Sequence, residues 1–573
     1  MRNRFFVTIG GLLIVALCLP TFIYSQQDAP PPPPQPATGA VRSGARASGS
    51  SAQAKAQQSA AVERDIAEAL TVIQDNYIDG DKIDYNVVFK SSINSMLHAL
   101  DPHSNFFDRA EFDEFRTDQR SQYFGIGASV IDLRLNGEVN TYIRATFPNS
   151  PAGRAGLLYG DRILEINGES MRNQPYYEIS KRLRGPLGTQ VKVTIEHAGS
   201  GRVETVEITR DAVAQPSIPE SYMIKPGIGY IALTGGFNLT TAEEFRVALE
   251  NLRSKGMQML ILDLRGNGGG LIKQAVSVAR TFLGRGQLIL TQKGRIRGST
   301  ETTVSDNDTP DNTPLVVLVN RGSASASEIV AGALQDHDRA LIVGENSFGK
   351  GLVQIPFPME YGTAVMLTIA KYYTPSGRLI QRDYSNNGYY DYITRGGTYR
   401  TDRLSAPAAP TGPESRTDTG RIVYGGGGIS PDEVIAPRTV SPAQQRLADS
   451  IFAFTLELAR GRVKGFETYK VERAIQFGHD LKEAEFPITD ALYKAFREYT
   501  IAQPSLKVTG AQLDRERSFV EARIRHELAT AAYGTITGYQ VFNADDPQIT
   551  RSIELLPRAR ELAQAALRTR KPS

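Results

Sequence analysis

The 573-residue chain has a single cysteine, Cys18, and this residue lies in an apolar run near the N-terminus. If that run is removed, the remaining chain can form no internal disulfide. Histidine is also scarce, with six residues in all, and none of them shows the spacing of a metal-ligand motif. We therefore expect a fold without cross-links and a site without a metal or another cofactor.

The chain also lacks a strong charge of either sign. It has 65 basic and 62 acidic residues, so the formal net charge is +3. The basic residues are scattered along the sequence, whereas nucleic-acid binding usually requires them to cluster on one face or along one helix. We therefore expect no nucleic-acid partner.

The first 25 residues combine Arg2 and Arg4 with an apolar run over residues 5–24. A basic start followed by an apolar stretch is typical of a secretory signal. Ser25 is small enough to end a cleavage site, while a run of about 20 residues is also long enough for an uncleaved anchor. We expect export to the bacterial periplasm or cell envelope, with membrane contact only through an uncleaved N-terminal segment.

Residues 26–61 contain the proline run APPPPPQP and continue mostly with Gly, Ala, Ser and Gln. With few large apolar side chains, this segment cannot bury enough surface to offset the chain entropy that ordering would remove. We expect a disordered tether, stiff in its proline part and loose in the rest.

Residues 62–117 show a helical pattern, because apolar residues recur at intervals of three to four. A second helix over residues 85–100 is expected to end at the turn ALDPHSNFF, since its proline cannot continue a helix. We expect His103 in this turn to pair with Asp101 rather than to act in catalysis.

The most informative segment spans residues 316–354. An apolar strand-like run leads into the small-residue turn GSASAS, and a helix-like segment follows at once. Small residues allow a sharp turn that leaves a serine hydroxyl at a helix N-terminus. No histidine lies close before this turn, while Lys350 follows a second apolar run. A serine activated by a lysine base is therefore the natural interpretation, and it is typical of a serine peptidase.

Lysine can accept a proton only when it is neutral, so its pKa must fall below the usual value of about 10.4. Burial against Phe348 and Val353 would lower the pKa of Lys350. Ser323 and Ser327 lie in the same turn and stay open as alternative nucleophiles.

The motifs SASASE and SFGKGLVQ resemble those of the carboxyl-terminal processing peptidases (tail-specific proteases), a family of Ser/Lys peptidases that carry a PDZ domain. By position, the resemblance implies Ser325 as the nucleophile and Lys350 as the general base. It also implies that Gln354 supports the lysine. An additional acid, which some descriptions of the family include, would fall on Asp336.

A second motif, LILDLRGNGGG over residues 260–270, is an apolar strand followed by a glycine-rich turn. Such a turn exposes backbone N–H groups that can stabilise an oxyanion. The resemblance implies that Gly269 supplies one donor, with Gly268 and Gly270 as alternatives, and that Ala326 supplies the other. No Gly-Lys-Ser/Thr follows the turn, which argues against a phosphate loop. Within the same motif, Asp263 and Arg265 are expected to pair and hold the loop.

Residues 118–211 resemble a PDZ domain, with alternating strand-like segments and a helix start at Ser-Pro-Ala. In such a domain, a loop captures the C-terminal carboxylate of a peptide, and the next strand pairs with the peptide. We expect Ile126 and a helix over residues 177–183 to line the side-chain pocket. The predicted peptide-binding loop consists of Tyr123, Phe124, Gly125, Ile126 and Gly127.

Residues 212–437 alternate strand-like and helix-like segments, which favours an α/β domain with a mostly parallel sheet. The resemblance implies a crotonase-like fold for this protease core. Residues 367–381 read as a strand and turn of the site architecture, and residues 384–428 as a long flexible loop.

Beyond residue 437 the sequence reads as a series of amphipathic helices. Its role is left open between packing on the protease, a dimer contact and the binding of an adaptor protein. The predicted fold is thus multidomain α/β, with the PDZ domain between an N-terminal helical segment and the protease core. By residue number, the expected parts are 1–25 signal peptide or anchor, 26–61 linker, 62–117 helical segment, 118–211 PDZ domain, 212–437 protease core and 438–573 helical extension.

Taken together, these features predict an exported serine endopeptidase that recognises polypeptide substrates by their free C-termini and forms an acyl-enzyme. The rival interpretation is a PDZ scaffold whose protease fold is silent. A third, an acyl-transfer enzyme, would need a coenzyme site, and we find none in the sequence. Cleavage of an unfolded protein separates the first interpretation from both others.

Overall fold

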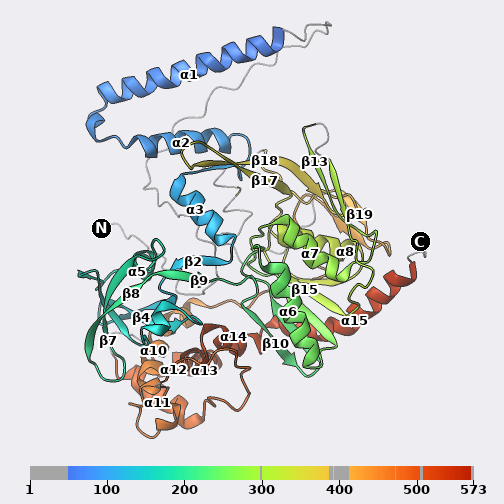
Figure 1. Ribbon diagram of the computed structural model, residues 1–573. Helices are drawn as coiled ribbons and strands as arrows, with labels where there is room; N and C mark the ends of the chain where they lie inside the picture. The colour runs from blue at the N-terminus through green and yellow to red at the C-terminus, as the bar shows by residue number, and fades with distance from the viewer. Residues whose placement is uncertain are drawn as a thin grey trace.

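The four parts of the molecule are an N-terminal helical segment, a PDZ domain, an α/β core and a set of C-terminal helices (Figure 1). The computed structural model describes residues 50–296, 300–385, 392, 412–471, 473–503 and 508–569, with the backbone alone for residues 50–56. The expected signal or anchor, most of the expected linker and most of the expected loop over residues 384–428 lie outside this range.

The N-terminal segment begins with helix α1 (Ser50–Asn76), a 3₁₀ turn η1 (Gly80–Lys82) and helix α2 (Tyr85–His98). α1 starts inside the range expected to be a linker, because Ala, Gln and Lys are good helix formers even where few side chains can be buried. The short strand β1 (Asn105–Phe107) and helix α3 (Arg109–Asp118) follow. β1 pairs antiparallel with strand β18 of the protease core, so this segment contributes a strand to the core.

The PDZ domain is a six-stranded sheet, in which five strands follow the order β3-β4-β5-β7-β8 and the short β6 pairs with β5. Its interior is formed by buried Ile, Leu and Val side chains from the strands and from helix α5, among them Ile143, Ile179 and Val193. A separate pair, β2 and β9, joins the two ends of the domain. The elements are β2 (Gln122–Gly125), β3 (Ala128–Leu135), β4 (Glu138–Thr146), α4 (Pro151–Arg154), β5 (Arg162–Ile166), β6 (Glu169–Ser170), α5 (Tyr176–Leu183), β7 (Gln190–Glu196), β8 (Val203–Thr209) and β9 (Asp211–Ala214).

The α/β core is built on a six-stranded sheet in the order β10-β11-β12-β15-β16-β21, parallel from β11 onward. One face packs against three helices that follow strands in the chain, α6, α7 and α8. The elements are β10 (Glu220–Lys225), β11 (Ile228–Ala232), α6 (Thr241–Ser254), β12 (Met259–Asp263), α7 (Ile272–Phe282), β15 (Leu315–Val319), α8 (Ala326–Asp336), β16 (Leu341–Gly344) and β21 (Glu433–Val434).

A second sheet lies beside the first and has the order β1-β18-β13-β14, with β17 paired to β18. Its strands are β13 (Leu288–Gly294), β14 (Glu301–Val304), β17 (Leu352–Pro358) and β18 (Ala364–Tyr373). The hairpin β19 (Glu414–Arg416) and β20 (Ile422–Tyr424) stands apart.

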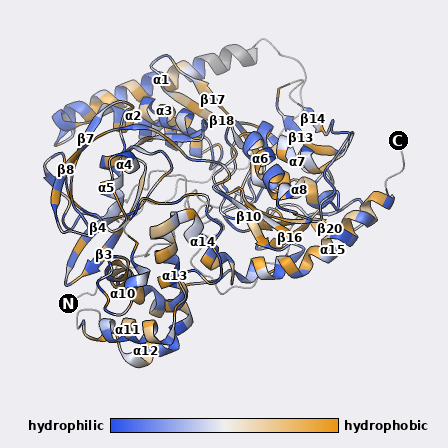
Figure 2. Cartoon of the chain, turned by 60° about the horizontal axis from the view of Figure 1, so that its bottom comes forward, coloured by the Kyte–Doolittle hydropathy of each residue, from blue (hydrophilic) through white to orange (hydrophobic). Residues whose placement is uncertain are grey.

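The C-terminal helices serve two different parts of the molecule. Helices α10 and α13 pack against the outer face of the PDZ sheet, where α10 contacts β3 and α13 contacts β4. Figure 2 shows α10 next to β3, while α11 and α12 lie further from the sheet and pack on α10 and α13. α15 instead covers the second face of the protease sheet, and Leu556 and Ile549 pack on β12 and β15. The elements are α10 (Pro442–Ala459), η2 (Glu467–Tyr469), α11 (Asp490–Ile501), α12 (Gly510–Arg515), α13 (Arg517–Tyr533), α14 (Thr535–Asn543) and α15 (Pro547–Thr569).

The last helix therefore completes the protease core, and packing on the protease is one of the three roles that the sequence analysis left open for the helical extension. A parallel sheet has to be covered on both faces, and this requirement explains the packing of α15.

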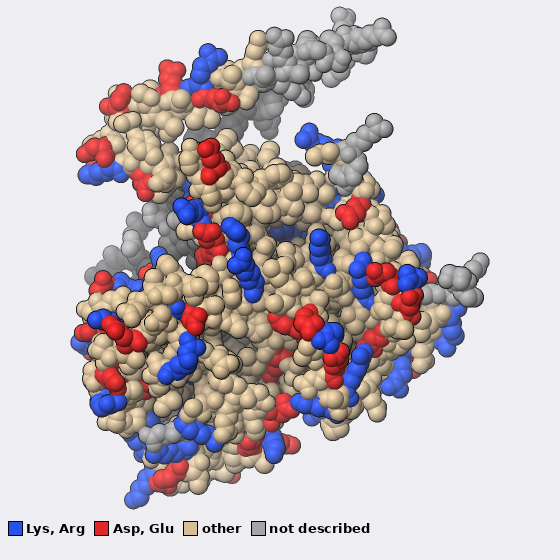
Figure 3. Space-filling model, in the orientation of Figure 1, with Lys and Arg blue, Asp and Glu red and all other residues tan. Residues whose placement is uncertain are grey.

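Acidic and basic side chains are interspersed over the face shown in Figure 3. Among the described residues, no helix combines the length and apolar character that a membrane span requires.

Candidate active site

Ser325 occupies a strained turn between β15 and α8. Its backbone has φ 54° and ψ −112°, a region that residues other than glycine rarely adopt. It immediately precedes α8, so the N–H of Ala326, the first residue of this helix, has no acceptor within the helix. The turn thus brings a serine side chain and an available backbone donor together.

The hydroxyls of the other two serines in the turn donate hydrogen bonds to backbone carbonyls. The Ser323 hydroxyl is buried and donates to the Leu264 carbonyl over 2.8 Å, and the Ser327 hydroxyl is buried and donates to the Asn267 carbonyl over 2.8 Å. Ser325 is only half-buried. The geometry therefore favours Ser325 as the nucleophile over the two alternatives.

Glu328 connects the serine turn to the lysine loop, and the sequence did not single it out. Its side chain is fully buried, with 0% exposure. One carboxylate oxygen accepts the backbone N–H groups of Ser325 and Lys350, both over 2.8 Å. The other accepts the Ser347 hydroxyl over 2.5 Å and the Gly349 N–H over 2.7 Å. Burial raises the pKa of the Glu328 carboxyl, and these four donors oppose that shift.

Tyr372, on β18, makes a second connection between the same two segments. Its buried hydroxyl lies 3.0 Å from the Ser325 carbonyl oxygen and 2.8 Å from the Lys350 carbonyl oxygen, and it shares its proton between them. The backbones of Ser325 and Lys350 are thus fixed by one carboxylate and one hydroxyl.

Lys350 has the lowered basicity that a lysine base requires. Burial lowers its pKa to about 8, while the carboxylates of Asp101 and Glu328 act in the opposite direction. A group with this pKa is largely neutral in mildly alkaline solution and can then accept a proton. The sequence predicted this shift from apolar neighbours, and the structure adds the two carboxylates that limit it.

Gln354 lies on β17, and its side-chain amide donates to the His103 carbonyl over 2.6 Å. Support of Lys350 by Gln354 stays a prediction, since this contact holds the His103 turn instead. In that turn the Asp101 carboxylate accepts the backbone N–H of His103 over 2.8 Å, so the expected pairing runs through the backbone. Burial and the nearby cations Lys350 and Arg382 lower the pKa of the His103 ring to about 2, which keeps it neutral.

The glycine-rich turn lies against the serine turn. A Cβ added at Gly269 would lie 2.7 Å from the Ser325 Cβ, and Gly269 has a φ of 101°. Its N–H donates to the Asn267 side chain over 2.9 Å. To serve as an oxyanion donor, Gly269 would have to exchange this hydrogen bond for one to the substrate. The same motif holds Asp263 and Arg265 in the expected ion pair, 2.6 Å apart.

Asp336 lies at the far end of α8, eleven residues after Ser325, which is about 16 Å at 1.5 Å per residue. Its carboxylate forms a buried ion pair with Arg378 over 2.7 Å and accepts the Ser376 N–H over 3.0 Å. These contacts hold the turn after β18 and do not reach Ser325. The geometry separates this residue from the reacting groups.

Most of the predicted peptide-binding loop belongs to strand β2, because Tyr123, Phe124 and Gly125 pair with β9. The carbonyls of Ile126 and Gly127 then accept the N–H groups of Ala152 over 2.7 Å and Phe147 over 2.9 Å. Ile126 is buried in the PDZ core together with residues of α5. These hydrogen bonds hold the turn in place, and it leads directly into β3.

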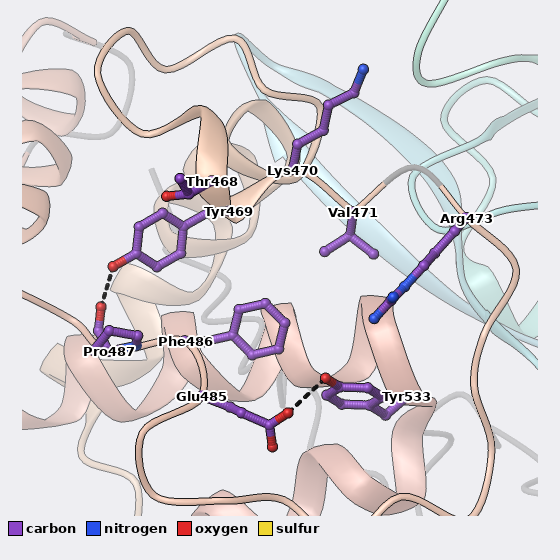
Figure 4. Close-up of a pocket in the computed structure, with 9 residues that line it drawn as sticks. All are labelled: Thr468, Tyr469, Lys470, Val471, Arg473, Glu485, Phe486, Pro487 and Tyr533. Carbon is purple, nitrogen blue, oxygen red and sulfur yellow. Dashed lines mark hydrogen bonds between the residues drawn. The ribbon is translucent and has the colours of Figure 1, made fainter.

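Elsewhere among the described residues we find no second candidate for a catalytic or metal site. Among the described residues, no group of three or more His, Cys, Asp or Glu side chains is arranged to hold a metal ion. A cavity of about 690 Å³ lies among the C-terminal helices, lined by Tyr469, Phe486 and Tyr533 (Figure 4). Its described lining contains no serine or cysteine, and its acid, Glu485, already accepts a hydrogen bond from Tyr533.

Two parts of this chain match known protein families. The profile of peptidase family S41 matches residues 227–386, and that of the PDZ domain matches residues 143–197. The carboxy-terminal-processing protease of Bartonella bacilliformis is 37% identical over 300 residues, which cover 51% of this chain and 67% of that protein. This chain belongs to the carboxy-terminal processing protease family.

A second curated relative agrees with this assignment. The carboxy-terminal processing protease CtpA of Bacillus subtilis is 35% identical over 52% of this chain and 63% of its own length. The solved photosystem II D1 C-terminal processing protease is 28% identical, with a TM-score of 0.34, over 62% of this chain and 84% of that one. The predictions of the family, of the multidomain α/β fold with a PDZ domain, and of a serine-type peptidase are confirmed.

Proposed function

We propose that this peptidase is an exported endopeptidase that holds the C-terminus of a polypeptide in its PDZ domain and cleaves through an acyl-enzyme on Ser325. The proposal rests mainly on two features of the same site. Ser325 is half-buried at the N-terminus of α8, and burial lowers the pKa of Lys350 to about 8. The export part rests on the N-terminal basic and apolar segment of the sequence.

In the proposed first step, the Ser325 Oγ attacks the scissile carbonyl carbon while the neutral Lys350 amine takes the hydroxyl proton. The Ala326 N–H, together with the glycine-rich turn, stabilises the oxyanion. The C–N bond then breaks, and the Lys350 ammonium donates its proton to the leaving amine. The first product is an ester on Ser325 and a free C-terminal fragment.

In the second step, Lys350 takes a proton from water, and the resulting hydroxide attacks the ester carbonyl. Collapse of the second tetrahedral intermediate releases the carboxylate product and returns the proton to Ser325. Glu328 and Tyr372 hold both segments in place through the cycle, because neither has to move a proton to do so.

The test uses one unfolded polypeptide prepared with a free and with an amidated C-terminus. We expect the free form to be cleaved faster and Lys350→Arg to be inactive, since arginine stays charged. Lys371→Arg is the matched control, because Lys371 lies exposed on β18. Equal cleavage of both forms would exclude tail recognition, and an active Lys350→Arg would exclude lysine as the base.

A further inference from the structure

We propose that helix α10 closes the far end of the PDZ peptide groove, so that the groove accepts only about the last six residues of a substrate tail. The proposal rests on the proposed function, in which the PDZ domain holds a free C-terminus. It assigns a role to the C-terminal helices, which neither family profile covers.

Strand β3 is the edge on which a bound tail would pair. It is the outer strand of the PDZ sheet, and within the described residues its strand partner is β4 alone. It begins at Ala128, directly after the turn at Gly127. A peptide that adds as an antiparallel strand, with its carboxylate at this turn, runs along β3 with its upstream residues pointing toward Arg134.

At Arg134 the free edge ends. The backbone N–H of Arg134 donates to the Asp449 carboxylate of α10 over 3.2 Å, so it cannot also pair with a peptide. Every second residue of a strand offers its N–H and carbonyl to the same side. Asp132 and Val130 therefore lie on the same edge as Arg134 and remain for the tail.

The helix that supplies Asp449 is firmly attached. The side chains of Leu133 and Tyr159 pack into one core with α10, and Phe452 of that helix contacts Tyr142 with ring centroids 6.0 Å apart. On α13, Glu527 forms a buried ion pair with Arg144 of β4 over 2.8 Å. The position of Asp449 is thus fixed relative to β3 from two sides.

The available length follows from the strand. Six residues, Ala128 to Leu133, precede Arg134 on β3. At about 3.4 Å per residue they span about 20 Å, which an extended tail of about six residues matches. Residues further upstream have to leave the edge at α10, and they add no strand pairing.

Binding of a length series tests this limit. Fluorescein-labelled Ala/Ser peptides of four, six, eight and ten residues, all ending in Val-Ala-Ala, are titrated into the full chain carrying Ser325→Ala. We expect the affinity to rise from four to six residues and then to stay constant within about twofold. With Asp449→Ala, the eight-residue peptide gains about fivefold, the equivalent of one further net hydrogen bond. Asp449→Asn keeps the limit at six, because its amide oxygen still accepts the Arg134 N–H.

An affinity that rises steadily to ten residues in the chain with native Asp449 would overturn the proposal, as would an Asp449→Ala chain that keeps the limit at six. The length series itself does not depend on how well any Asp449 variant folds. Amidated peptides serve as the control for the proposed function. If they bind as well as the free ones, or if no peptide binds, tail recognition itself is wrong.

Discussion

Replacement of Glu328 by Gln is the perturbation for which the structure predicts the most specific result. Each carboxylate oxygen accepts two donors, Ser325 and Lys350 on one side and Ser347 and Gly349 on the other. The amide nitrogen of glutamine has to replace one of these oxygens. Whichever side it takes, at least one backbone N–H loses its acceptor in a fully buried position.

A hydrogen bond to a charged group contributes about 1.5–3 kcal/mol, so the loss of one or two costs about 2–6 kcal/mol. That is a large share of the roughly 5–15 kcal/mol that keeps a typical protein folded. If about 3 kcal/mol of this cost is expressed as misalignment of Ser325 and Lys350, kcat falls about 100-fold, since each 1.36 kcal/mol is a factor of ten.

The assay is kcat against pH on an unfolded polypeptide, with thermal unfolding measured in parallel. The negative charge of Glu328 raises the pKa of Lys350, so the neutral variant should shift the acid limb of the profile below the wild-type position near pH 8. A residue that only stabilised the fold would lower the melting temperature without moving this limb. Wild-type kcat within threefold, together with an unmoved limb, would refute the role given to Glu328.

Three further results are expected. Wild-type kcat/KM should rise as the pH increases through about 8, because only the neutral Lys350 amine accepts a proton; a pH-independent rate from pH 6 to 9 would argue against this. Gly269→Ala should lower kcat at least about 100-fold in an initial-rate assay, because the new Cβ would lie 2.7 Å from the Ser325 Cβ and would disturb the oxyanion donors. Near-normal turnover would show that this turn takes no part in catalysis. Leu556→Ala should lower the free energy of unfolding by about 2–5 kcal/mol in urea denaturation, and a cost below 1 kcal/mol would show that α15 is not part of the core.

The strands of the protease core show which parts of the fold could be predicted from the sequence. The run LVVLV of β15 is buried at every position, which predicts a strand covered on both faces. The covering helix on one face is its neighbour in sequence, α8, while α15 lies more than 200 residues further on. Amphipathic periodicity predicts that α15 is a helix, but it carries no information about which distant surface the helix covers.

The catalytic motifs predict a nucleophile at Ser325 and a base at Lys350, since the residue types and their spacing are specific. The same motifs contain Glu328, an acid among the small and apolar residues of the helix ASEIVAGALQD. An acid in such surroundings could have indicated a buried carboxylate with several hydrogen-bond partners. The sequence alone could not show the four hydrogen-bond donors to Glu328, because three of them lie on the loop that contains Lys350. The acid assigned by resemblance, Asp336, instead pairs with Arg378, a residue 42 positions away.

Digestion of an unfolded protein such as casein by the wild-type chain, beside Ser325→Ala, tests the central claim most directly. Both proteins are first shown to have the same melting temperature, so that a difference in cleavage reflects chemistry. We predict complete digestion by the wild type and none by Ser325→Ala. Cleavage by the variant at even a tenth of the wild-type rate would contradict the assignment of Ser325 as the nucleophile.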